Sequence, residues 1–200
     1  MGAISVSIDA RKLDDITRLL ADIKGGVPKA LVGAINDTSR QTVTQISKSI
    51  RDRVNIKKAD IDKHIKKTNA TPARMSARIT LSESNRLGLK YFGAKQTKKG
   101  VSYRIDKANS TLAKSGKIVH GARQFIPGAF IGTSRLGEQV FKRVGKGRLP
   151  IRKLMGISPW GAFVMAGLKR RTQAEATALL EKNVDRRVNF LLLKQSGAIK

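Results

Sequence analysis

Few side chains in this sequence are of the types that do chemistry. The 200 residues include no cysteine and two histidines, His64 and His120. A chain without cysteine forms no disulfide, zinc–thiolate site, iron–sulfur cluster or thiol nucleophile. His64 lies among lysines and His120 in a glycine-rich stretch, and neither has Asp or Glu at triad or metal-ligand spacing. We therefore interpret both histidines as surface or packing residues.

The carboxylates form no catalytic pattern either. Asp60 and Asp62 are two residues apart, which on a helix points them about 200° from each other. We expect them to favour a helix start and to offset the nearby lysines. A metal-dependent nuclease needs several converging carboxylates, whereas the 14 acidic residues are spread over the whole chain. No GxxxxGK[ST] phosphate loop occurs. The sequence thus predicts neither an enzyme nor a cofactor.

Charge is the strongest signal in the sequence. There are 41 Lys and Arg against 14 Asp and Glu, a formal net charge of +27. A chain this basic repels itself, so its natural partners are polyanions such as DNA, RNA, anionic lipid or an acidic protein surface. We expect the contacts with DNA or a partner to come from basic loops. The candidates are Lys95, Lys98, Lys99, Lys107, Lys114, Lys117, Arg123, Lys142, Arg143, Lys146, Arg148, Arg152 and Lys153.

Any contact with nucleic acid is expected to be blind to base sequence. The chain has no zinc-finger spacing, no basic region leading into heptads and no aromatic RNA-binding strand. Aromatic residues make up 4% of the chain, too few for a platform that stacks bases. Phosphate contacts remain, and these depend on salt rather than on sequence.

These basic loops must be held by helices and strands, and the N-terminal half predicts two helices after a strand at residues 3–8. The first helix covers about residues 10–24 and ends at Gly25-Gly26. The second runs from about residue 27 to 53, with Pro28 in its first turn.

One face of this second helix is apolar, and the opposite face carries Ser, Thr, Gln and Asn instead of charge. Such a helix suits packing against a neighbouring subunit, although a solvated polar face fits equally well. The residues expected to pack between subunits are Leu31, Ile35, Val43, Ile46 and Ile50. A short helix from Lys57 or Lys58 is expected to carry Ile61 and Ile65 on one side.

The middle of the chain predicts strands and turns. Pro127 and Gly128 are expected to form a structural turn between two apolar pairs. The predicted strands cover residues 73–81, 86–92, 101–105 and 138–144. From about Ser158 a C-terminal helix begins, with Ser158 as N-cap and a break near Gly167.

Together these elements predict a single α+β domain over residues 1–200. Its core is a small antiparallel β-sheet or a barrel-like β structure, packed by the long helix of the N-terminal half and by the C-terminal helix, with basic loops or hairpin arms. Its parts are an N-terminal strand and helix (1–26), a helical segment (27–68), a β-rich basic middle (73–153) and the C-terminal helix (158–195).

Nothing in the sequence indicates a membrane partner. No stretch reaches the roughly 18–20 consecutive apolar residues of a transmembrane helix. The first residues have neither the basic region nor the apolar run of a signal peptide. We expect a soluble protein that is made and kept inside the cell.

Two consecutive segments resemble a known family. RQFIPGAFI (residues 123–131), followed by QVFKRVGKGRLPIRKLMGISP (139–159), is similar to the minor tail protein Z family of tailed bacteriophages and prophages. The segments at residues 27–67, 73–81 and 87–94 are similar too, in the same order.

The resemblance implies a virion structural protein that completes the tail at its head-proximal end. In the neck region such proteins form rings, commonly hexameric, from α+β subunits. The implied partners are further copies of the chain, the tail terminator or tail tube, the head connector and the phage genomic DNA in its channel. The implied location is the neck of the virion tail, after assembly in the host bacterial cytoplasm, and no catalytic residue is carried over.

Two questions stay open from the sequence. The basic loops could touch DNA or the acidic surface of an adjoining ring, and both contacts are compatible with the residues. The alternative function is a free nucleic-acid-binding protein without sequence specificity, because the net charge alone fits it as well.

Overall fold

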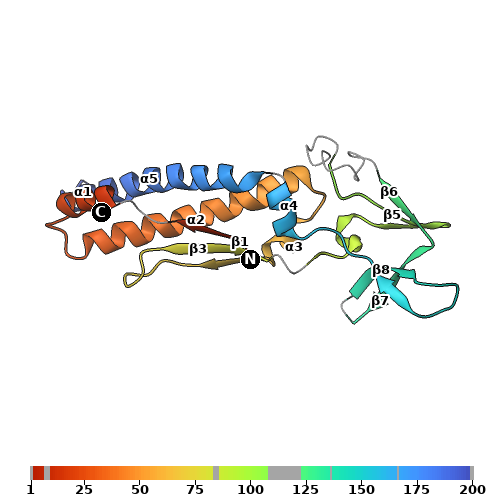
Figure 1. Cartoon of the computed structure of the whole chain (residues 1–200). Helices are drawn as coiled ribbons and strands as arrows, with labels where there is room; N and C mark the ends of the chain where they lie inside the picture. Colours follow the sequence, from red (N-terminus) through yellow and green to blue (C-terminus); the bar gives the residue numbers. More distant parts are fainter. Residues whose placement is uncertain are drawn as a thin grey trace. The chain divides into compact units, whose positions relative to one another are not determined.

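The computed structural model describes residues 2–6, 10–82, 86–107, 123–135, 137–165 and 167–198. The fold is α+β, as the sequence predicts, with two long helices beside short strands (Figure 1). In chain order the elements are β1 (Gly2–Val6), α1 (Ala10–Leu19), α2 (Gly26–Arg53), α3 (Lys58–Asp62), β2 (Ile65–Thr68), β3 (Ala77–Leu81), the 3-10 helix η1 (Leu89–Phe92), β4 (Lys95–Thr97), β5 (Gly100–Tyr103), β6 (Gln124–Pro127), β7 (Ala129–Ser134), β8 (Gly137–Arg143), β9 (Ile151–Lys153), α4 (Pro159–Met165) and α5 (Leu168–Gln195).

The described strands form three small open sheets. Their strand orders are β1-β3-β2, β4-β5-β6 and β7-β8-β9. The pairs within the second and third sheets are antiparallel, with Val101 opposite Ile126 and Phe130 opposite Phe141. The described strands therefore bear out the small antiparallel sheets and not the barrel-like alternative.

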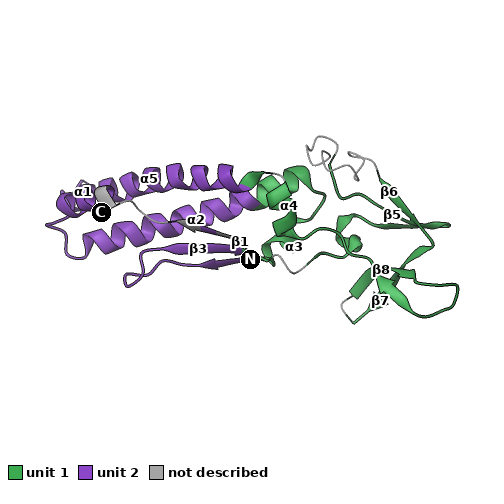
Figure 2. Cartoon of the chain, in the orientation of Figure 1, with its two compact units in different colours: residues 1, 47–64, 81–168 green, residues 2–46, 65–80, 169–200 purple. Residues whose placement is uncertain are grey.

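The chain divides into two compact units (Figure 2). Unit 1 comprises residues 1, 47–64 and 81–168, and unit 2 comprises residues 2–46, 65–80 and 169–200. Unit 1 holds the two sheets β4-β5-β6 and β7-β8-β9. Unit 2 holds the sheet β1-β3-β2, α1, α5 and most of α2.

The core of unit 2 forms where α2 lies between α5 and the sheet β1-β3-β2 (Figure 1). Apolar residues recur on α2 at helical spacing, and those of β3 alternate, so each element turns one apolar side inward. The buried cluster contains Ile16, Leu20, Ala30, Leu31, Ala34, Ile35, Ala70, Ala77, Ala176, Leu180, Val184 and Val188.

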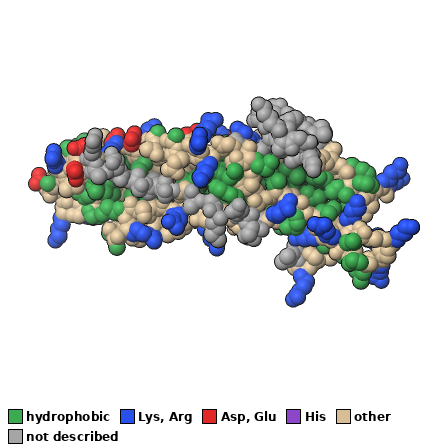
Figure 3. Space-filling view, viewed as in Figure 1, with side chains coloured by type: hydrophobic (Ala, Val, Ile, Leu, Met, Phe, Trp, Pro, Cys, Tyr) green, Lys and Arg blue, Asp and Glu red, His purple; other side chains and the backbone are tan. Residues whose placement is uncertain are grey.

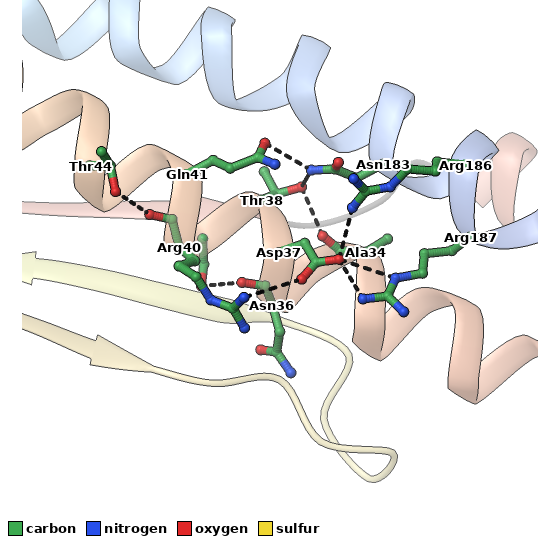
Figure 4. Close-up of polar contacts among 11 residues, drawn as sticks. Ala34, Asn36, Asp37, Thr38, Arg40, Gln41, Thr44, Asn183, Arg186 and Arg187 are labelled. Atoms are coloured by element: carbon green, nitrogen blue, oxygen red, sulfur yellow. Dashed lines mark hydrogen bonds and ion pairs between the residues drawn. The ribbon is translucent and has the colours of Figure 1, made fainter. Parts of the chain in front are cut away.

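Buried hydrogen bonds also join α2 to α5 (Figure 4). The Asn183 amide of α5 donates to Thr38 Oγ1 at 2.9 Å and to Gln41 Oε1 at 3.2 Å. Thr38 in turn donates to the Ala34 carbonyl at 2.8 Å, one turn earlier in its own helix. A buried polar group is tolerated only when it is hydrogen-bonded, so these pairs fix which residues of the two helices lie opposite each other.

The carboxylate of Asp37 on α2 also joins this helix to α5. Asp37 is 12% exposed and accepts hydrogen bonds from Arg187 at 2.6 Å and from Arg186 at 3.0 Å (Figure 4). Arg40 approaches the other carboxylate oxygen at 3.8 Å. Charge-assisted bonds to guanidinium groups are stronger than neutral ones, so this contact adds to the pairing of α2 with α5.

The structure corrects the assignment of the apolar face of α2 to a neighbouring subunit. Four of the five residues assigned there, Leu31, Ile35, Ile46 and Ile50, are buried inside the chain itself, and Val43 is half-buried. The polar residues of the helix are buried too, at Thr38, Ser39, Thr42 and Ser47. Leu31 and Ile35 belong to the buried cluster that α2 shares with α5 and β3, so they stabilise the subunit's own fold.

Two expected elements are also different. Ile65 does not continue the short helix, because α3 ends at Asp62 and Ile65 begins the strand β2. Residues 86–92 do not form a strand, and Leu89–Phe92 form the 3-10 helix η1, which buries Leu89 and Phe92. In both places short apolar runs fitted two kinds of element equally well.

The C-terminal helix begins and breaks where the sequence predicts. Ser158 Oγ accepts a hydrogen bond from the Gly161 N–H at 3.0 Å, which caps the first turn of α4. Gly167 has φ of 65° between α4 and α5. This left-handed conformation suits glycine and ends α4 before α5 begins.

Candidate functional site

The most basic described element is the β8–β9 hairpin of unit 1. Residues 142–153 contain six basic residues and no acidic one. Five of them are exposed, namely Lys142, Arg143, Lys146, Arg148 and Arg152, and Lys153 is half-buried. The strand register places Lys142 directly opposite Arg152.

This pairing has an electrostatic cost. Like charges directly opposite each other destabilise a pair of strands. Neither Lys142 nor Arg152 forms an ion pair with a carboxylate of the described residues. The hairpin therefore presents positive charge that an external anion can neutralise.

The hairpin is nevertheless firmly held. The Val144 N–H donates to the Pro150 carbonyl at 3.1 Å across its loop, and the Leu154 N–H donates to the Val140 carbonyl at 2.8 Å. The Arg143 guanidinium lies 5.2 Å from the ring centre of Phe130 on β7, a cation–π contact. An ordered hairpin loses less conformational entropy on binding than a flexible loop does.

Its tip also exposes apolar side chains. Val144 is 67% exposed and Leu149 is 72% exposed, and Ile151 at the start of β9 is exposed as well. Single exposed apolar residues are ordinary, but three of them among six cations on one hairpin are suited to a protein partner as well as to a polyanion.

A second basic hairpin is formed by β4 and β5. Lys95 on β4 and Lys98 and Lys99 in the turn are all exposed. Thr97 Oγ1 donates to the Gly100 carbonyl at 2.8 Å and tightens this turn. The side-chain oxygen of Gln96 accepts from the Ile131 N–H at 2.8 Å, which ties β4 to β7 within unit 1.

The other predicted contact residues have different surroundings. Lys107 is exposed. Lys114 and Lys117 lie outside the described residues, as does His120. Arg123 donates to the Gly93 carbonyl at 2.7 Å and to the Ser102 carbonyl at 3.1 Å. Its guanidinium thus holds β5 in place and is less available to a ligand than the exposed lysines are.

The predicted structural turn links two sheets. Pro127 ends β6, and Gly128 follows with φ of 69° before β7 begins. Beside it, Tyr103 donates a hydrogen bond to Gln124 between β5 and β6, and burial raises the pKa of the Tyr103 phenol above its usual value. The tyrosine therefore stays neutral as a structural link.

The chemistry-bearing residues of the described chain do not converge. Asp62 pairs with Lys58 at 2.6 Å and Asp60 with Lys63 at 3.7 Å, so each carboxylate serves a local ion pair. Within the described ranges no three His, Cys, Asp or Glu side chains lie close enough together to hold a metal. None of the helices in this part of the chain is both long enough and apolar enough to cross a membrane.

Charge is distributed unevenly over the face drawn in Figure 3. Acidic side chains gather over the α1 end of unit 2, where Asp14, Asp15 and Asp22 are exposed. Over the β7–β9 sheet of unit 1 the visible charged side chains are Lys and Arg (Figure 3).

Sequence reasoning missed a second group of cations. Arg74 and Arg78 lie within the predicted strand at residues 73–81 and are not among the predicted contact residues. In the structure they line a surface hollow of about 230 Å³ together with Thr68 and Ser76, on the β2–β3 hairpin of unit 2. The alternation of residues along β3 indicates which of its side chains are exposed. Thr68 lines the hollow only because β2 lies next to β3, which the sequence pattern does not show.

These features define a basic α+β protein with exposed cations on the β8–β9 and β4–β5 hairpins. The chain matches the family described as prophage minor tail protein Z (GPZ) over residues 11–195, and it belongs to that family. The resemblance read from residues 123–159 is thereby confirmed. It is therefore a prophage minor tail protein, a structural component that associates with other parts of a phage tail. No curated protein and no solved structure matches the chain.

Proposed function

We propose that this protein completes the phage tail at its head-proximal end, as a ring of identical subunits, six in number, in the neck of the virion. Its partners there are the tail terminator or tail tube, the head connector and the genomic DNA in the channel that the ring borders. It acts by binding and carries out no catalysis. The family membership supports this proposal, and the unneutralised β8–β9 hairpin is the single structural observation that carries it.

The chemistry of this hairpin suits a channel through which DNA must pass. Lysine and arginine attract phosphates without reading bases, and salt screens the attraction. DNA held in this way can stop and later slide, because no base-specific contact has to be broken. A tight, sequence-specific site would oppose that movement.

The same hairpin also suits contact with a neighbouring protein ring. Val144 and Leu149 at its tip gain free energy when they are buried against a partner, at about 25 cal/mol per Å² of apolar area, and the cations beside them favour an acidic surface. We therefore propose contact with both DNA and an adjoining ring. Contacts between copies of the chain must use surfaces other than the covered face of α2.

The experiment that tests the location is a cryo-EM reconstruction of the neck of particles that carry this protein. We expect a ring of this chain between the connector and the tail tube, with the β8–β9 hairpins toward the channel or the adjoining ring. Absence of the chain from the neck would overturn the proposal. It would favour the free nucleic-acid-binding protein instead.

Replacing Lys142, Arg143, Lys146 and Arg148 together by Ser is expected to reduce infectivity by at least tenfold. The four side chains are exposed, and exposed substitutions usually change stability by less than about 0.5 kcal/mol each. Plaque assays and the DNA content of purified particles measure the effect, and the thermal melt of the purified variant shows that it still folds.

A matched control removes the same charge elsewhere. Lys24, Lys29, Lys169 and Arg170 are exposed in unit 2, and their joint replacement by Ser is expected to leave infectivity within about threefold of the unmodified phage, because the β8–β9 hairpin stays intact. Normal infectivity of the hairpin variant would contradict its role in the neck.

A further inference from the structure

The outer side of the β2–β3 hairpin in unit 2 is polar and contains a surface hollow. Along β3 the apolar residues Ala77, Ile79 and Leu81 are buried, whereas Arg78 is exposed. Alternate residues of a strand share one side of the sheet, so the outer side is the one away from α2. Thr68, Arg74, Ser76 and Arg78 line a hollow there of about 230 Å³, which we call the arginine hollow.

The hairpin that carries the arginine hollow is clamped onto α2. Asn36 donates to the Ala70 carbonyl at 3.1 Å and accepts from the Ala70 N–H at 2.8 Å. In the turn, Thr71 and Arg74 exchange two backbone hydrogen bonds of 3.0 and 2.9 Å. The backbone that presents Arg74 is therefore fixed before any ligand arrives, which lowers the entropic cost of binding.

The charge around the arginine hollow has one sign. Residues 65–80 contain Lys66, Lys67, Arg74 and Arg78 and no Asp or Glu. All four cations are exposed, and none forms an ion pair with a carboxylate of the described residues. Two guanidinium groups and two hydroxyls are the donors that proteins direct at phosphate oxygens.

We propose that the arginine hollow binds the phosphate backbone of duplex DNA. Arg74 and Arg78 each neutralise a phosphate, and Thr68 and Ser76 donate to its oxygens. No aromatic residue lies within residues 65–80, so the site stacks on no base and reads no sequence. Duplex DNA fits better than an acidic protein, because the hollow offers hydrogen-bond donors and cations without an apolar residue in its lining.

This inference deepens the proposed function and rests on it for the identity of the polyanion. It gives the chain a second phosphate contact, in unit 2, in addition to the β8–β9 hairpin of unit 1. Two separate contacts allow one subunit to bind more phosphates than either hairpin alone, which steepens the dependence of DNA affinity on salt.

The test is a salt titration of the purified full chain with a 30-base-pair fluorescent duplex of mixed sequence. Each phosphate contact contributes about 0.9 to the slope of log K against log salt. The variant Arg74→Ser with Arg78→Ser is expected to lower the slope by about 2 and the affinity at low salt by at least tenfold. The effect is expected to be the same for duplexes of different sequence.

A matched control tests whether the loss is local. Lys169→Ser with Arg170→Ser removes the same charge from exposed positions of α5, on the other side of α2 from the sheet. This control is expected to change the slope by less than half as much. A second variant, Thr68→Ala with Ser76→Ala, keeps all charge and is expected to lose affinity with little change in slope.

The outcomes separate this inference from the proposed function. An Arg74/Arg78 variant that binds DNA like the unmodified chain would overturn the inference, and so would an equal loss in the α5 control. If the purified chain binds no duplex DNA but its Arg74/Arg78 variant loses an acidic tail partner, the arginine hollow is a protein site and the inference is wrong. Imaging of the neck tests where the chain lies in the particle. None of these binding results bears on that location.

Discussion

Replacing Ile46 and Ile50 together by Asp is expected to leave no folded protein. Both side chains lie on α2, with exposures of 0% and 1%. A carboxylate buried without a partner costs several kcal/mol, and two of them together match the roughly 5–15 kcal/mol by which a whole domain is stable. We expect the variant to be insoluble, or soluble without helical circular dichroism and without a cooperative melt.

The control for this prediction uses the same helix. Thr44 and Lys48 are exposed on α2, so Thr44→Asp with Lys48→Asp adds two carboxylates to the helix without burying them and is expected to fold. Chromatography at low concentration separates two explanations for a defect in the Ile46/Ile50 variant. If that variant were a folded monomer that fails to assemble, Ile46 and Ile50 would face a neighbouring subunit and not the interior of their own chain.

The apolar periodicity of α2 predicts that one side of the helix is buried, but not which element covers it. The spacing of Leu31, Ile35, Ile46 and Ile50 correctly marks one side of a helix that must be buried. It does not say what buries it. For Leu31 and Ile35 the covering elements include β3 and α5, and Asn183 of α5 bonds to Thr38 from 145 residues further along the chain. Because sequence patterns are local, such a partner is invisible to them, and a subunit interface fitted the same pattern.

For the basic residues too, the sequence predicts charge and exposure but not tertiary contacts. Charge and composition identified residues 142–153 as an exposed basic segment, and the structure adds the register that sets Lys142 against Arg152. Arg123 was grouped with the free cations because its type is the same. Its hydrogen bonds to the carbonyls of Gly93 and Ser102 depend on a tertiary contact that no spacing encodes.

The arginine hollow could be predicted from the sequence only in part. The strand expected at residues 73–81 forms only over β3, Ala77–Leu81, and Arg74 and Ser76 precede it. The hollow itself requires Thr68 from β2 and the clamp of Asn36 on Ala70. Neither follows from the pattern of residues 73–81, because each depends on an element elsewhere in the chain.

Within unit 1, the largest loss of stability is expected from Gly156→Ala, which adds a single methyl group. A Cβ at residue 156 would overlap Cε2 of Phe92 and would lie 2.9 Å from both Cδ2 and Cζ of the same ring. Phe92 is fully buried, so its ring cannot move aside at low cost. Overpacking of this kind costs about 1–3 kcal/mol, occasionally more. We expect a melting temperature lower by roughly 2–12 °C for a chain of this size.

The overlap affects the candidate site because Gly156 helps to hold the β8–β9 hairpin in place. Its N–H donates to the Leu87 carbonyl at 2.6 Å, and its carbonyl accepts from Arg86 at 2.9 Å. Leu154, directly after β9, accepts from the Leu89 N–H at 3.1 Å. A shift of residue 156 therefore strains the segment that anchors the hairpin, and we expect faster proteolysis within residues 142–153.

Two further variants show whether the overlap with Phe92 is the cause. Gly145→Ala places a methyl group where no heavy atom lies within 4 Å and is expected to change stability by less than about 0.5 kcal/mol. Phe92→Leu in the Gly156→Ala background shortens the side chain that the methyl group meets. Because the two residues are in contact, their effects should not add, and the double variant should be more stable than the sum of the single losses predicts. If the losses simply added, the ring would not be what excludes a side chain at residue 156, and the close packing of residues 154–157 on η1 would need another cause.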